Sequence, residues 1–267
     1  MHKLDGMPRP NIINLKECDD RREYIIEEFK QYGVNDILIH SYDRYENSNV
    51  KFIGHDKAIG ETPKGVTSSH LLTIKHWLET TDAEWGIFFE DDVDLSTINY
   101  WNGFNFTDIV NRFGTRWECL HLCGIFESLV ALVPRKRETY DFGLQAYIMK
   151  RKYASKLVKF YFTEPDPYSI NFRMPHGYHT STENNILGSF GITYTFPFFN
   201  HNIFFKSKNH HTTTGEQLPS AVYAQKIIQD MWKTELLNCN LEEIFDHFRV
   251  AHLSIRYEKI RYEQQGT

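Results

Sequence analysis

The 267-residue sequence lacks several features that would assign its class at once. No apolar run approaches the roughly 18 residues needed to cross a bilayer, and residues 1–10 contain no apolar core of a secretory leader. The four cysteines are scattered without CxxC spacing, which favours neither a zinc site nor a disulfide framework. These absences predict a cytoplasmic protein of a reducing compartment that does not insert into membranes.

Two common phosphate-binding motifs are also missing. No GxGxxG follows the first apolar segment, and no GxxxxGK[ST] occurs anywhere in the chain. The net charge of −5 gives no general attraction to nucleic acid or anionic membranes. A nucleotide bound by this chain would therefore need a metal and basic side chains to hold its phosphates.

Residues 85–94 form the most informative stretch, because a short run of bulky apolar residues ends there at a cluster of acids. Such a run predicts a buried strand. Alternation along an extended chain would place Glu90, Asp92 and Asp94 on one face, and Asp91 would face the other way. Crowded carboxylates repel one another unless a cation balances them, and their oxygens suit magnesium or manganese. The alternative is a solvated acidic loop that ends a strand.

The N-terminal part of the chain predicts a β-α-β unit. Residues 12–15 and 34–41 are expected strands, and the helix between them ends at Gly33. Asp19 or Asp20 is the expected N-cap of that helix. This order favours a parallel sheet, in which the acid-tipped strand is the third parallel strand. Ligands bind such sheets at the carboxyl ends of the strands. Asn14, Arg21 or Arg22, Asp43 and the acids from Glu90 onward all lie near such ends.

A second helix is expected just before the acid-tipped strand, with Ser68 or Ser69 as its N-cap. His70 in the first turn would either reach a phosphate at the helix end or pack against the core. Further strands are expected at 117–125, 141–149 and 191–199, and helices at 152–162, 220–237 and 241–257. Because no linker precedes the last two helices, residues 219–267 are expected to form a C-terminal helical extension packed on a domain of residues 1–218.

Short segments occur in a characteristic order: Asn14-Leu15, Asp20-Arg21-Arg22, Ser69-His70 and Glu90-Asp91-Asp92. Further on, Ala146-Tyr147-Ile148-Met149 is followed by Arg151 and Ala154. This series resembles glycosyltransferase family 25, which includes lipooligosaccharide and collagen galactosyltransferases. The later stretch Tyr194-Thr195-Phe196-Pro197 is similar to members of that family found in marine phages and large viruses.

The resemblance implies the nucleotide-sugar transferase type A fold, an α/β domain with a Rossmann-like mixed sheet flanked by helices. It implies transfer of a sugar, usually from a UDP-linked donor and with inversion, to a hydroxyl of a glycan or glycoconjugate. The implied cofactor is Mn²⁺ or Mg²⁺, because a carboxylate-held ion stabilises the charge left on the departing diphosphate. The implied location is the cytoplasm of a bacterial or virus-infected cell.

The resemblance also assigns residues to the site. The expected nucleotide-binding residues are Asn14, Arg22, Asp43, Ser69, His70 and Asp91. The expected metal ligands are Glu90, Asp92, Asp94, His210 and His211, the two histidines from a polar loop in which Lys206 or Lys208 suits phosphate. Two registers of the acidic motif are open, Glu90-Asp91-Asp92 and Asp92-Val93-Asp94, and Asp92 belongs to both.

The expected catalytic carboxylates are Glu183 and Asp94. An inverting transfer needs a carboxylate that accepts the proton of the attacking hydroxyl, and Glu183 is the candidate base. The alternative for Glu183 is a first-turn acid of a short helix capped by Ser181 or Thr182.

The acceptor has alternatives. Gln145 and Tyr147 are expected to border it, with packing as the other explanation for Tyr147. A phage-type enzyme could instead modify DNA bases through basic residues at 135–137, 150–159 and 256–261, although the net acidic charge favours a glycan acceptor. A different class of protein is a non-catalytic glycan-binding module that holds a metal at the same acids.

Overall fold

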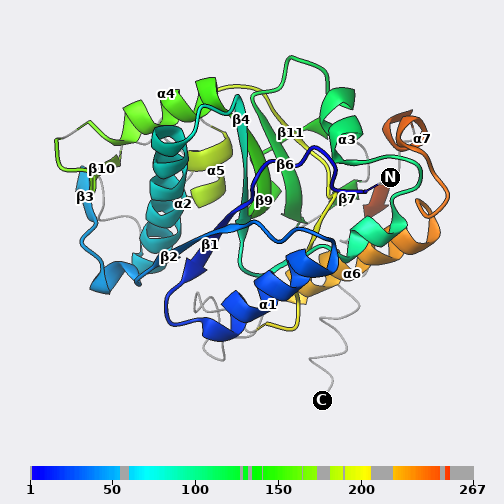
Figure 1. Ribbon diagram of the computed structural model, residues 1–267, viewed down its shortest axis with the longest axis horizontal. Helices are drawn as coiled ribbons and strands as arrows, with labels where there is room; N and C mark the ends of the chain where they lie inside the picture. The colour runs from blue at the N-terminus through cyan, green and yellow to red at the C-terminus, as the bar shows by residue number, and fades with distance from the viewer. Residues whose placement is uncertain are drawn as a thin grey trace.

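The computed structural model describes residues 2–54, 60–126, 129–131, 134–139, 141–163, 165–172, 181–188, 190–205, 219–246 and 250–252. Within these ranges the chain forms a mixed seven-stranded sheet with helices on both faces (Figure 1). This architecture confirms the predicted α/β fold class. Among the helices so described, none combines the length and apolar character required to span a membrane.

The order of strands across the sheet is β2 (Leu38–Tyr42), β1 (Asn11–Leu15), β4 (Trp85–Glu90), β9 (Asp141–Lys150), β6 (Cys119–Phe126), β11 (Thr193–Thr195) and β8 (Arg135–Lys136). Strands β2, β1 and β4 are parallel, since Ile12 pairs with Ile39 on one side and with Phe89 on the other. Strand β9 is antiparallel to both β4 and β6. The carboxyl ends of β1, β2 and β4 therefore meet at one edge of the sheet, as the β-α-β pattern predicted.

Each face of the sheet carries its own core cluster. One cluster includes residues of α1 (Asp19–Gln31), η3 (Ser96–Tyr100), α3 (Phe106–Arg112), α6 (Pro219–Thr234) and α7 (Leu241–Asp246). The other includes residues of α2 (Glu61–Thr80), α4 (Arg151–Tyr161) and α5 (Thr182–Leu187). The remaining elements are η1 (Tyr45–Asn47) and the strand pairs β3 (Lys51–Gly54) with β10 (Ser169–Phe172), β5 (Val93–Asp94) with β12 (Asn200–His201) and β7 (Leu129–Ala131) with β13 (Val250–His252).

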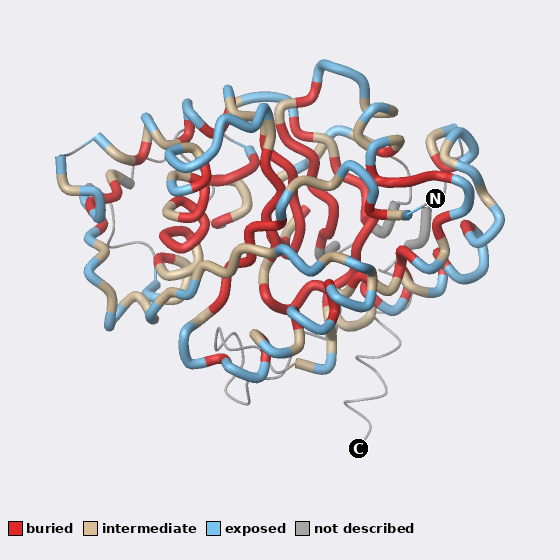
Figure 2. Tube along the Cα trace, in the orientation of Figure 1, coloured by how far each residue is buried: buried red, intermediate tan, exposed pale blue. Residues whose placement is uncertain are grey.

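Strand β4 is anchored from both faces. Phe88 stacks on Tyr147 with ring centroids 5.1 Å apart, and Phe89 packs edge to face on Phe29, also at 5.1 Å. These rings are fully buried, and Figure 2 shows that buried positions concentrate along the sheet and the inner sides of the helices. Burying one such side chain contributes about 1.5–3 kcal/mol, so the position of the acidic end of β4 is fixed by the core.

The start of α1 differs from the prediction. Cys18 is the N-cap, and Asp19 and Asp20 both lie in the first turn without capping. Acids there interact favourably with the positive end of the helix dipole, so their presence does not require a cap. The end of the helix is confirmed: Gly33, with φ of 77°, directly follows the C-cap Tyr32.

Helix α2 begins earlier than predicted. Its N-cap is Gly60, and Pro63 lies in the first turn, where a proline is tolerated. Ser68 and Ser69 are therefore not caps, because each lies within the helix and donates its hydroxyl to the carbonyl oxygen three residues earlier at 2.9 Å. His70 is mid-helix and fully buried, so it does not lie at a phosphate-binding helix end.

One further difference from the prediction concerns long-range strand pairing. Helix α7 ends at Asp246 and residues 250–252 form β13, so the helix predicted over 241–257 was wrong in its second part. Cys119 and Cys123 are buried free thiols. A register irregularity between them places Cys119 in one core cluster and Cys123 in the other.

His121 is expected to make the protein sensitive to acid. It is fully buried, with Nε2 lying 2.8 Å from the carbonyl oxygen of Gly143. Burial, assisted by the charge of Arg137, lowers its pKa from 6.5 to about 3. Between these values the unfolded chain binds more protons than the folded one, so stability falls as the pH falls through that window.

The His121→Gln variant lacks the pH-dependent contribution of His121 to stability. Between pH 6.5 and about 4.5 we expect the free energy of unfolding of the wild type to fall by roughly 2–3 kcal/mol more than that of the variant. Urea denaturation at each pH measures both slopes. Equal slopes would contradict a neutral buried His121.

Candidate functional site

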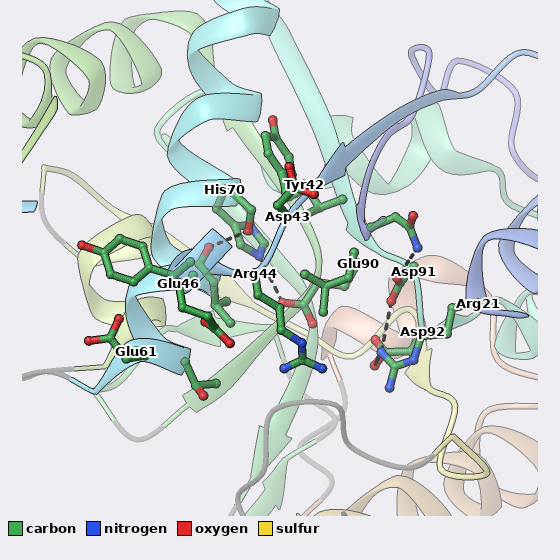
Figure 3. Close-up of a pocket in the computed structure, with 18 residues that line it drawn as sticks. Arg21, Tyr42, Asp43, Arg44, Glu46, Glu61, His70, Glu90, Asp91 and Asp92 are labelled. Atoms are coloured by element: carbon green, nitrogen blue, oxygen red, sulfur yellow. Dashed lines mark hydrogen bonds and ion pairs between the residues drawn. The ribbon is translucent and has the colours of Figure 1, made fainter. Parts of the chain in front are cut away.

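A cavity of about 400 Å³ opens at the carboxyl ends of β1, β2 and β4 (Figure 3). Strand ends converge at this edge, which is where ligands bind parallel sheets. The polar lining consists of Asn14, Arg21, Tyr42, Asp43, Arg44, Tyr45, Glu46, Glu61, Thr62, Ser69, His70, Glu90, Asp91 and Asp92. Figure 3 shows Arg21, Asp91 and Asp92 together at one end and Glu46 and Glu61 at the other.

Asp91 has both carboxylate oxygens engaged. Oδ2 accepts a hydrogen bond from Asn14 Nδ2 at 2.7 Å, and Oδ1 accepts one from Arg21 Nη1 at 3.1 Å. Burial and the charge of Asp92 raise the pKa of Asp91 to about 6, with Arg21 opposing the rise. Asp91 thus joins the end of β1, the first turn of α1 and the end of β4.

Asp92 is held through one oxygen and leaves the other without a partner. Oδ2 accepts from Arg21 Nη1 at 2.9 Å and lies 3.2 Å from His201 Nε2. Burial alone would raise the pKa of Asp92, but the charges of His201 and Arg21 outweigh it and lower the pKa, so the group is ionised. Oδ1 is buried and has no hydrogen-bond partner among the described residues. A buried, ionised oxygen in this state favours a cation beside it.

His201 reaches Asp92 through a short antiparallel ladder. Strand β12 pairs with β5, which places His201 opposite Val93, and the Asn202 N–H donates to the carbonyl oxygen of Asp92 at 2.8 Å. Burial would lower the pKa of His201, but the adjacent Asp92 outweighs it and the pKa is raised. No local pattern in the sequence indicates this histidine, because its position depends on pairing between distant segments.

Glu90, the last residue of β4, is oriented by a buried polar chain. Its Oε1 lies 3.1 Å from His70 Nε2, and His70 Nδ1 lies 3.0 Å from the Tyr147 hydroxyl. Burial lowers the pKa of His70 to about 3, so its imidazole is neutral. Burial and the charge of Asp92 raise the pKa of Glu90 to about 8. Tyr147 is fully buried, in agreement with the packing explanation for it.

The predicted alternation of the acids was wrong beyond the strand. Strand β4 ends at Glu90 and the chain turns, so Asp91 and Asp92 both contact Arg21 instead of facing opposite ways. Periodicity of two applies only while the backbone stays extended.

Asp94 does not line the cavity. Its Oδ2 accepts from Gln229 Nε2 at 3.0 Å, and its Oδ1 accepts from the Ser96 N–H at 2.7 Å. The cavity contains Glu90-Asp91-Asp92, and the geometry therefore favours this register of the acidic motif over the one that includes Asp94.

The predicted nucleotide-binding residues divide into two groups. Asn14, Asp43, Ser69, His70 and Asp91 line the cavity. Arg22 does not, because it pairs with an acid on the surface of α1, and Arg21 lines the cavity in its place. One residue along a helix rotates the side chain by about 100°, so only one of two adjacent arginines can face the acids.

Tyr42 and Arg44 also line the cavity, although neither was among the predicted site residues. Both flank Asp43 directly after β2, so the end of that strand could have identified them. The Tyr42 hydroxyl lies 2.8 Å from Thr73 Oγ1, and Arg44 Nε donates to Glu17 Oε1 at 2.7 Å.

Glu183 is not among the residues that line the cavity. It lies in the first turn of α5, whose N-cap is Ser181, and its Oε1 accepts from the Gly143 N–H at 2.9 Å. Its charge acts on the pKa values of both His70 and Glu90. The structure thus brings Glu183, from a distant part of the chain, towards the acidic end of β4.

Part of the predicted site lies outside the described residues, namely His210, His211, Lys206 and Lys208. Phe205, just before that segment, is described. Its ring lies over the guanidinium of Arg21, with 5.3 Å to the centroid, and packs edge to face on Tyr24 at 5.0 Å. An aromatic ring therefore covers the acid cluster on this side.

The side chains at the end of β4 can supply part of a binding site for a divalent cation. Within the described ranges, no three His, Cys, Asp or Glu side chains gather as a complete metal site. The buried Asp92 Oδ1 and the half-buried carboxylate of Glu90 nevertheless supply oxygen donors of the kind that magnesium and manganese use. They fit a cation whose remaining ligands are phosphate oxygens and water.

Three arginines of the predicted DNA-binding segments make contacts within the fold. Arg135 pairs with Asp141 at 2.5 Å, and Arg137 donates to the carbonyl oxygen of Asp141 at 2.7 Å. Arg151 donates to the carbonyl oxygen of Leu78, also at 2.7 Å. Residues 256–261 lie outside the described ranges.

The buried ion pairs and the exposed ones predict different costs of mutation. Asp91→Ala leaves Arg21 and Asn14 without a shared partner in a buried site, so we expect a loss on the order of 3 kcal/mol in the free energy of unfolding. Asp43→Ala removes only an exposed pair with Lys16, and we expect a loss below about 1 kcal/mol. Urea denaturation of both variants without added metal measures the difference. Equal losses would show that the Asp91 network is not structural.

Comparisons with known proteins leave the family open. No family model matches the chain, and no curated protein matches it in sequence. Among similar solved structures, A197 from STIV has a TM-score of 0.38 and 12% identity over 72% of this chain and 84% of that one. HddC from Yersinia pseudotuberculosis has a TM-score of 0.35 and 14% identity, and the match covers 83% of this chain and 79% of that one. The inositol-1-phosphate CTP transferase from T. maritima has a TM-score of 0.36 and 10% identity, and the match covers 82% of this chain and 76% of that one. The function is therefore inferred from the residues of the site.

Proposed function

We propose that this protein is a glycosyltransferase that moves a sugar from a nucleoside diphosphate sugar to a hydroxyl of a glycan or glycoconjugate. The observation that carries this proposal is the buried, ionised Asp92 at the carboxyl ends of the parallel strands β1, β2 and β4, whose Oδ1 finds no hydrogen-bond partner in the part of the chain that the structure describes. The cavity beside it, of about 400 Å³, has the size of a small-molecule site. The resemblance to glycosyltransferase family 25 supports the same activity and a UDP-linked donor.

Asp92 and Glu90 are proposed to hold Mn²⁺ or Mg²⁺. When bound, the cation would balance the negative charge that develops on the departing diphosphate. Asp92 is fixed for this role by Arg21 and His201. Glu90 is oriented by His70, and such supporting contacts set the direction in which a ligand points.

Residues after β1 and β2 are proposed to bind the nucleotide. Asp43 provides a carboxylate that suits ribose hydroxyls. Arg44 provides positive charge for a phosphate, and Glu17 orients its guanidinium. Asn14 holds Asp91, and so positions the acidic turn from the same edge.

Glu183 is proposed as the base that accepts the proton of the attacking hydroxyl. Its Oε1 is held by the Gly143 N–H, and its charge acts on the pKa values of Glu90 and His70. Gln145 is buried two residues further along β9, and its Oε1, which has no hydrogen-bond partner within the described ranges, would receive an acceptor hydroxyl. A glycan acceptor is favoured over DNA, because the arginines at 135, 137 and 151 are engaged within the fold.

The activity is tested with a panel of UDP-sugars and other nucleotide sugars in the presence of Mn²⁺. We expect slow hydrolysis of at least one donor, measured as release of the nucleoside diphosphate. A protein that binds and hydrolyses none of them would contradict the proposal. Binding of a glycan without turnover of any donor would favour the non-catalytic module.

The assignment of Asp92 is tested by a pair of matched variants. Asp92→Asn removes the charged oxygen proposed to hold the cation, so we expect donor hydrolysis to fall by roughly a hundredfold. Asp94→Asn should stay close to the wild type, because an amide oxygen can still accept from the Ser96 N–H outside the cavity. A larger loss for Asp94→Asn than for Asp92→Asn would show that the other register of the motif is used.

A further inference from the structure

Arg21 places a fixed positive charge inside the acid cluster. A single nitrogen, Nη1, contacts Asp91 Oδ1 at 3.1 Å and Asp92 Oδ2 at 2.9 Å, and none of the three side chains is more than 9% exposed (Figure 3). An arginine does not lose its proton in proteins. This cation is therefore present at every pH at which the protein folds, whether or not a metal is bound.

The same contacts separate the two aspartates by role. Asp91 has one oxygen bound by Arg21 and the other by Asn14, so each of its oxygens already accepts a hydrogen bond. Asp92 gives one oxygen to Arg21 and retains a buried Oδ1 to which no described residue donates a hydrogen bond. Arg21 therefore orients Asp92 so that a specific oxygen remains for a cation.

We propose that Arg21 is a positioning residue that acts as a built-in counter-cation for Asp91 and Asp92. It holds the acid cluster together without metal, and it weakens the binding of a divalent cation that arrives alone. The cation consequently binds together with a polyanion, which under the proposed function is the nucleoside diphosphate. This last step rests on the proposed function, whereas the effect of Arg21 on the cation does not.

The physical reason is the charge balance around Asp92. A divalent cation at Oδ1 would lie close to the guanidinium, and like charges repel more strongly in a buried site than in water. Magnesium-like ions are held by one or two carboxylates together with substrate phosphates. A diphosphate supplies negative charge that offsets the charges of both the ion and Arg21. Binding of the diphosphate should therefore increase the affinity for the cation, and binding of the cation should increase the affinity for the diphosphate.

The test measures Mn²⁺ binding by the EPR signal of the free ion, without and with UDP. We expect Arg21→Gln to bind Mn²⁺ alone roughly tenfold more tightly than the wild type, and UDP to tighten Mn²⁺ binding by a similar factor in the wild type but less in the variant. Arg21→Lys keeps the charge and should lie closer to the wild type than to Arg21→Gln. Arg112→Gln is the matched control, because Arg112 also contacts two acids, Glu242 and Asp246, but at an exposed site.

Thermal unfolding provides a second measurement. Arg21→Gln leaves two buried carboxylates without their cation, so it should melt below the wild type and recover more of its stability when Mn²⁺ is added. A variant that stays unfolded at saturating Mn²⁺ would overturn the proposal, because a dication should replace the missing charge.

The remaining outcomes also decide. An Mn²⁺ affinity of Arg21→Gln equal to or below that of the wild type overturns the counter-cation role. A gain in Mn²⁺ affinity without any effect of UDP supports that role and counts against the proposed function alone. Tight binding of Mn²⁺ by the wild type that UDP does not change overturns the coupling.

Discussion

Carboxylates at the end of a buried strand need positive charge or hydrogen-bond donors close by, and the elements around β4 are arranged to supply them. Asn14 comes from β1, Arg21 from α1, His70 from α2 and His201 from β12. Helices α1 and α2 are packed on the sheet by apolar side chains, and β12 is held by its pairing with β5, so packing and pairing together determine where the balancing groups lie. The arrangement leaves Asp92 Oδ1 unbalanced, and this single atom is the basis for assigning a cation and a diphosphate to the site.

The location of the site could be predicted from the sequence because it depends on local patterns. A β-α-β opening and a third apolar strand fix the direction of β1, β2 and β4, and parallel strands bring their carboxyl ends together whatever the side chains are. Asn14, Asp43 and the acids after β4 were placed at one edge by this reasoning alone. The packing of Phe88 and Phe89 into opposite clusters follows from the same period of two.

The detail of the site could not be predicted, since it depends on where regular structure stops. Periodicity of two fails after Glu90 because the chain turns there, which separates Asp94 from the cavity. The choice between Arg21 and Arg22 depends on the rotational setting of α1, which begins after Cys18 and not after an aspartate. His201 depends on two residues of β12 pairing with β5, and so short a ladder has no signature in sequence.

The most direct test of this account locates the cation itself. Crystals grown with Mn²⁺ and UDP, measured at a wavelength near the manganese absorption edge, would show the ion as a peak in the anomalous difference map. The account predicts a peak at roughly 2–2.5 Å from Asp92 Oδ1 and next to Glu90, with the diphosphate on its open side. A peak bound to Asp94 or Asp91, or bound UDP with no peak near Asp92, would contradict it.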